Sequence, residues 1–96
     1  MPKGFWIVHV TITDPQNYPK YLAADKIAFD KYGARFPVRG GRYEAPEGPA
    51  RQRHVVIEFG SYEKALECYY SPEYQLAAKM RRAYADSEIV IVEGTE

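Results

Sequence analysis

The chain has 96 residues, which suits one compact domain spanning residues 1–96, and its 13 basic and 13 acidic side chains leave no net charge. This balance gives no electrostatic footprint for nucleic acid or for an anionic membrane, so neither is an expected partner. A single cysteine, Cys68, excludes an internal disulfide and a cysteine-based zinc site. With neither a membrane-spanning apolar stretch nor a signal-peptide pattern in the sequence, we expect a soluble cytoplasmic protein.

The first predicted strand covers residues 4–12, which are rich in β-branched and aromatic side chains. One face of this strand is wholly apolar and should meet the helices, whereas the other face is mixed, as expected of a face that meets a partner or a pocket. The apolar face carries Trp6, Val8, Val10 and Ile12, and the mixed face carries Phe5, Ile7, His9 and Thr11.

A helix is predicted next, at about residues 19–32. Asp14 and Pro15 form a helix-start signal, but Pro19 lacks the N–H that an uninterrupted helix would need at its fifth position. We therefore predict a short turn at residues 15–18 before the helix, and Gly33 as its C-terminal stop. The expected buried stripe is Tyr18, Leu22, Ala28, Phe29 and Tyr32.

Two further strands are predicted on either side of a loop at residues 45–50. Residues 34–44 are typical of an edge strand, because Pro37 cannot donate to a sheet ladder and Gly40-Gly41 suggests a bulge. Residues 53–59 form the third strand. Val55, Ile57 and Phe59 should face the helices, and His54, Val56 and Glu58 should face the other side.

The last third of the chain predicts a helix in two parts and a final strand. Ser61 can cap the first part, and Ser71-Pro72-Glu73 provides a second cap that restarts the helix. Residues 87–94 predict the last strand. Cys68 falls within the helical part and is expected to be a small core residue.

The resulting order, β-α-β-β-α-β, predicts an α+β fold with one four-stranded antiparallel sheet. Two helices can cover only one face of such a sheet, yet strands one, three and four are apolar at nearly every position. The uncovered face must therefore meet something, and the same face of a second copy is the simplest candidate. We predict a two-fold homodimer.

RNA-recognition motifs share this element order and stack bases on aromatic side chains of the sheet. The corresponding positions here are His54 and Val56, and the opening Arg/Lys-Gly is replaced by Gln52-Arg53. RNA binding is therefore disfavoured.

Several polar residues are candidates for a site. His9 and His54, with Glu58 on the same face, could act in acid–base chemistry, or could be polar groups of a dimer interface; no metal is expected, because no HxH or HExxH spacing occurs. Glu58 needs a partner, and Arg39 or Arg81 could supply it, either as a structural ion pair or within an active site. Tyr69 belongs to an aromatic helix stripe that could line a pocket or form core.

The sequence resembles a bacterial family catalogued as domain of unknown function 1330, in the dimeric α/β-barrel (ferredoxin-like) superfamily. The resemblance covers nearly the whole chain and implies a ferredoxin-like homodimer whose sheets pack face to face, with no established activity. It rests on Thr13-Asp14-Pro15, Tyr32-Gly33, Val38-Arg39-Gly40-Gly41, Glu47-Gly48, Val55-Val56-Ile57-Glu58-Phe59, Ser71-Pro72-Glu73-Tyr74-Gln75, Arg81 and Val92-Glu93-Gly94.

The hypothesis from sequence is a pocket between sheet and helices that binds or converts a small organic molecule without a cofactor. Arg39 and Arg81 would hold an anionic group such as a carboxylate. The other candidates are His9, His54, Glu58 and Tyr69. The alternative is a non-catalytic homodimer whose polar residues serve only the interface, and the sequence leaves open whether the protein is an enzyme.

Overall fold

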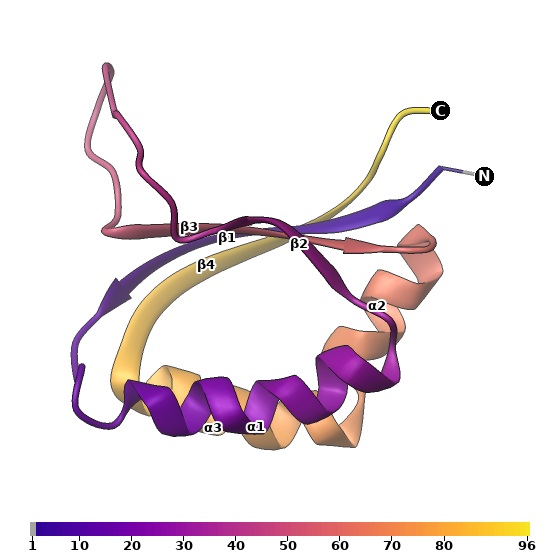
Figure 1. Ribbon diagram of the computed structural model, residues 1–96, viewed down its shortest axis with the longest axis horizontal. Helices are drawn as coiled ribbons and strands as arrows, with labels where there is room; N and C mark the ends of the chain where they lie inside the picture. The colour runs from indigo at the N-terminus through magenta and orange to yellow at the C-terminus, as the bar shows by residue number, and fades with distance from the viewer. Residues whose placement is uncertain (1) are drawn as a thin grey trace.

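The computed structural model describes residues 2–96, which form a four-stranded antiparallel sheet with three helices on one side of it (Figure 1). The strands are β1 (Gly4–Ile12), β2 (Arg35–Arg39), β3 (Arg53–Phe59) and β4 (Ala85–Glu93), in the spatial order β2-β3-β1-β4. The helices are α1 (Tyr18–Lys31), α2 (Tyr62–Tyr70) and α3 (Pro72–Tyr84). The predicted α+β order is confirmed, with the second helix divided in two.

The two faces of the sheet have the predicted side chains. Trp6, Val8 and Val10 of β1 are buried under the helices. On β3, Ile57 is opposite Trp6 and Val55 is opposite Val8 in the register, and both are buried on the same face together with Phe59. The opposite face has no helix over it and exposes Val38, Val90 and Val92.

Helix α1 begins one residue earlier than predicted, after the expected turn. The Asn17 backbone N–H donates to Asp14 Oδ1 at 3.2 Å, and Pro19 lies in the first helical turn, where its missing N–H costs nothing. The predicted buried stripe was partly wrong, because the face turned to the sheet also contains Tyr21 and Asp25. Tyr18, Tyr21 and Asp25 follow the i, i+3, i+7 spacing of one helix face.

Strand β2 is shorter than predicted and ends at Arg39. It pairs with β3 through a register shift between Arg35 and Val38, so the irregularity falls around Pro37 rather than at the two glycines. Gly40 turns the chain out of the sheet with φ 67°. Residues 40–50 are then all exposed and form a loop that rises on the side of the sheet away from the helices (Figure 1).

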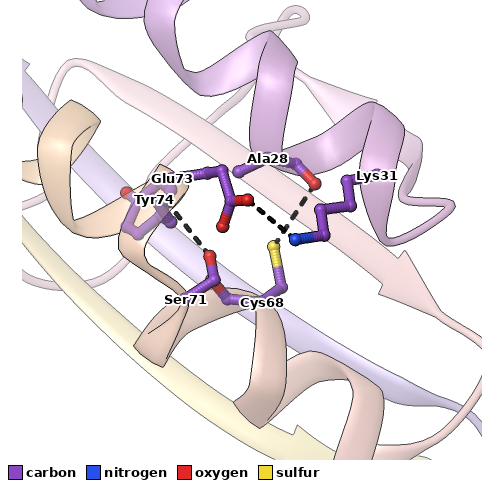
Figure 2. A network of polar contacts seen from close by, with 6 residues as sticks. All are labelled: Ala28, Lys31, Cys68, Ser71, Glu73 and Tyr74. Carbon is purple, nitrogen blue, oxygen red and sulfur yellow. Dashed lines mark hydrogen bonds and ion pairs between the residues drawn. The ribbon is translucent and has the colours of Figure 1, made fainter.

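The junction between α2 and α3 is built around Ser71, as the second cap predicted. Its hydroxyl donates to the Cys68 carbonyl oxygen at 2.7 Å. It also accepts from the Tyr74 backbone N–H at 3.1 Å (Figure 2). Cys68 is fully buried, as expected of a core residue. An ion pair between Lys31 and Glu73, at 2.7 Å, joins α1 to the start of α3. The junction therefore fixes where α3 starts relative to α1. Helix α3 leads directly into β4, which begins two residues earlier than predicted.

Candidate functional site

A cavity lies between the helix-covered face of the sheet and helices α1 and α3. Its volume, measured as the space that the centres of water molecules can occupy, is about 30 Å³, which is enough for about two waters. Trp6, Phe29 and Phe36 contribute aromatic walls. Polar groups reach the same space from four elements: Tyr18, Tyr21 and Asp25 from α1, Arg39 from β2, Arg53 from β3, and Tyr74 and Arg81 from α3.

Three guanidinium groups line this cavity. Arg39 is opposite Val55 in the sheet register and therefore points to the helix side, where its guanidinium lies 4.1 Å from the centre of the Phe36 ring. Arg81 is only 7% exposed, although it carries a permanent charge. The Nε atoms of Arg53 and Arg81 are buried and have no hydrogen-bond partner. Both arginines therefore keep an unsatisfied donor in the protein interior.

A chain of hydroxyl groups connects Arg81 to α1. Arg81 Nη1 donates to the Tyr74 hydroxyl oxygen at 2.6 Å, and the Tyr74 and Tyr21 hydroxyls lie 2.8 Å apart. Burial raises the pKa of both tyrosines, so both remain protonated at neutral pH. Either hydroxyl can be the donor of this bond, because a phenol oxygen that accepts from Arg81 still has a second lone pair.

Asp25 is the acidic group of the cavity. Its side chain is 4% exposed, and its Oδ1 atom has no hydrogen-bond partner. Burial raises the pKa of Asp25 from 3.8 to about 7, against the opposing effects of the Arg39 guanidinium, the Tyr21 hydroxyl and Arg53. This carboxyl group therefore changes charge close to neutral pH, which is the range useful for proton transfer.

The structure places two of the six candidates predicted from sequence in the cavity. Arg39 and Arg81 both line the cavity. Tyr69 lies just outside it, with its ring centre 5.7 Å from that of Trp6 and 5.6 Å from that of Tyr74, and packs in the aromatic core. Tyr74, at the start of α3, lines the cavity instead.

The other three candidates lie on the opposite, uncovered face of the sheet. Glu58 pairs with neither Arg39 nor Arg81, so that prediction was wrong; its carboxylate contacts Lys3 Nζ at 3.1 Å. The alternation of β3 explains this, because Glu58 follows the buried Ile57 and must point away from the cavity. His9 and His54 are directly paired across β1 and β3, with their Nδ1 atoms 2.8 Å apart.

The histidine pair lines a separate hollow on this face, together with Pro49, Ala50, Arg51 and Glu88. Glu88 of β4 is opposite His9 in the register, but Arg51 holds both of its carboxylate oxygens. The ring of Tyr43 packs edge-on against His54, with centres 4.5 Å apart. Within residues 2–96, no three histidine, cysteine or acidic side chains are grouped to hold a metal ion.

Sequence reasoning missed Asp25, Tyr21 and Arg53. One signal could have found the first two, because they share a helical face with Tyr18, Ala28 and Phe29. Arg53 could have been found from the alternation of β3, because it shares a face with Val55 and Ile57. It is the first residue of β3, and its guanidinium packs against Gly40, where an added Cβ would lie 2.2 Å from Arg53 Nη1.

Residues 3–95 match the family described as a domain of unknown function, DUF1330. The chain belongs to the DUF1330 family. A search of the curated proteins finds no match to this DUF1330 protein.

Solved structures show the same fold. A protein of unknown function from Rhodopseudomonas palustris has a TM-score of 0.78 at 18% identity, covering 99% of this chain and 84% of that one. SnoaB, a cofactor-independent oxygenase from Streptomyces nogalater, has a TM-score of 0.66 at 13% identity, covering 100% and 96%. A dimeric ferredoxin-like protein of unknown function from Bacteroides fragilis has a TM-score of 0.52 at 16% identity, covering 95% of each chain.

At these identities the comparisons establish the ferredoxin-like fold of the DUF1330 protein and carry no chemistry. Across the described residues, none of the helices combines the length and the apolar character needed to cross a membrane.

Proposed function

We propose that this DUF1330 protein binds or converts a small organic anion in the cavity between the sheet and the helices. One observation carries the proposal: three guanidinium groups and a carboxyl group converge on an aromatic-walled cavity while Asp25 Oδ1, Arg53 Nε and Arg81 Nε lack partners. A buried polar atom without a partner costs about 1–3 kcal/mol, so leaving several around one space is expensive. Apolar cavities with a few convergent polar groups are typical ligand sites.

The three arginines have complementary roles in this proposal. Arg81 is fixed by burial and by its bond to Tyr74, so it offers a preorganised donor to an anion. Arg39 is exposed and stacks on Phe36, so it can leave its position to admit a ligand and return over it. Such movement is required, because the cavity has room for only about two water molecules.

The test is a thermal-shift screen of small carboxylates and aromatic acids. We expect saturable stabilisation by at least one compound, rising with concentration as expected for binding to the folded state alone. Arg39→Ala should abolish it. Arg35→Ala is the matched control, because Arg35 is on the same strand opposite Glu58 and faces away from the cavity. Equal loss in both variants, or no stabilisation by any compound, would contradict the proposal.

A second candidate function is a non-catalytic homodimer that acts through protein contacts. The uncovered sheet face supports a homodimer, since it exposes Val38, Val90 and Val92 to solvent in a single copy. The Bacteroides fragilis protein of similar fold is described as dimeric. Sedimentation velocity should show a dimer at micromolar concentration, and Val90→Asp should convert it to a monomer. A monomeric wild type at that concentration would contradict this pairing.

The two candidates make different demands on the cavity. If the dimer alone is the function, Arg39→Ala should leave the assembly unchanged and the screen should find no ligand. If the cavity is the site, Arg39→Ala should remain dimeric yet lose the stabilisation by ligand.

A further inference from the structure

The cavity is lined by charged side chains of both signs, three arginines and one aspartate. Arg39, Arg53 and Arg81 approach from β2, β3 and α3, and Asp25 approaches from α1. An anion placed among the three guanidinium groups therefore also lies near the carboxyl group of Asp25. Two carboxylates at close range in a poorly solvated space repel one another, and this repulsion favours uptake of a proton by one of them.

We propose that the ligand is the carboxylate of a small organic acid with an apolar body, and that it binds together with one proton carried by Asp25. This proposal rests on the proposed function. The protonated Asp25 oxygen becomes a donor, and the ligand carboxylate supplies the acceptor that Oδ1 lacks in the empty cavity. The aromatic walls from Trp6 and Phe36 suit the apolar body of the acid.

The other groups that face Asp25 hold fixed charges near neutral pH. The arginines remain cationic throughout this range. Burial raises the pKa of Tyr18, Tyr21 and Tyr74, so these phenols stay neutral. Burial also raises the pKa of the Cys68 thiol, on α2, to about 12. The two histidines lie on the opposite face of the sheet. Proton uptake between pH 6 and 9 can thus be assigned to Asp25, whose pKa is already raised to about 7 by burial.

The test is a ¹H–¹⁵N chemical-shift titration of the whole protein with benzoate, and with acetate as the smaller acid, at pH 6, 7, 8 and 9. We expect shifts in residues of α1, β2 and α3 that line the cavity. Affinity should be constant below about pH 7 and fall about tenfold per pH unit above it, as required by uptake of one proton. Asp25→Asn, whose side chain is permanently neutral, should bind at every pH with a flat profile.

The outcomes separate this inference from the proposed function. Binding of benzoate or acetate that stays constant from pH 6 to 9 in the wild type overturns proton coupling and leaves the anion site intact. Tighter binding of neutral benzyl alcohol than of benzoate also overturns it, because Asp25 would then act as an ionised acceptor. No binding of either acid at any pH overturns the proposed function itself. Arg39→Ala should abolish binding of both acids at all four pH values, and undiminished binding in this variant would overturn the proposed function.

Discussion

Replacing Asp25 by asparagine should make the protein less sensitive to rising pH. The pKa of Asp25 is raised from 3.8 to about 7 by burial, so the folded state holds its proton where the unfolded chain has lost it. Because the unfolded chain binds fewer protons between these two values, stability falls as pH rises through this window. Across the whole window the raised pKa of Asp25 should lower the free energy of unfolding by about 4 kcal/mol, since each pKa unit is worth about 1.4 kcal/mol.

The quantity to measure is the free energy of unfolding of the wild type minus that of Asp25→Asn. Urea unfolding can be followed by the fluorescence of Trp6, the only tryptophan, which is fully buried. Taking the difference cancels the titration of all other groups, together with any constant effect of the amide. This difference in the free energy of unfolding should decrease by about 1.4 kcal/mol per pH unit from pH 4.5 to 6.5, and level off above pH 7.5.

Parallel stability curves for the two proteins from pH 4 to 8 would refute this reasoning. They would mean that Asp25 titrates normally in the folded state, and that water or a nearby arginine solvates its charge. A difference that increases with pH would refute it more strongly, because it would show that the ionised carboxylate stabilises the fold through its guanidinium neighbours.

Three further predictions concern the frame around the cavity. Ser71→Ala should lower the free energy of unfolding by about 1 kcal/mol in urea, because α3 loses its cap. Gly40→Ala should cost at least as much and should also weaken benzoate binding in the same titration, because Gly40 has φ 67° and an added Cβ would lie 2.2 Å from Arg53 Nη1. Glu58→Gln should change stability by less than about 1 kcal/mol and leave benzoate binding unchanged, since its partner Lys3 is largely exposed and lies outside the cavity. The first prediction is contradicted if Ser71→Ala is as stable as the wild type. The second is contradicted if Gly40→Ala binds benzoate with unaltered affinity, and the third if Glu58→Gln binds it more weakly.

The strands and their faces could be predicted because their side chains alternate strongly. Residues 4–12 and 53–59 became β1 and β3 with unchanged bounds, and their buried and uncovered sets were assigned correctly. The expected length of β2 was wrong, because the positive φ of Gly40 ends the strand where the sequence suggested only a bulge. Backbone geometry at one glycine outweighed the β propensity of the residues after it.

The site was harder to predict than the fold because it depends on charged residues in buried places. Aspartate is usually exposed, so Asp25 was left off the predicted buried stripe of α1. In the structure it is almost fully buried. Glu58 drew attention as a carboxylate within an apolar strand, but its place on the uncovered face lets Lys3 pair with it cheaply. Arg39 and Arg81 were chosen as possible partners of Glu58, and both line the cavity although that pairing was wrong.

The shared cap at Ser71 has a consequence for how this family can vary in length. Successive residues of an α-helix are rotated by about 100°, so one residue inserted between Ser71 and Arg81 would turn the guanidinium away from the cavity while leaving the helix intact. The exposed loop at residues 40–50 has no such restriction, because it contributes no side chain to the cavity. Relatives with this cavity should therefore keep a fixed spacing from the serine to the arginine, and should differ in length mainly in that loop.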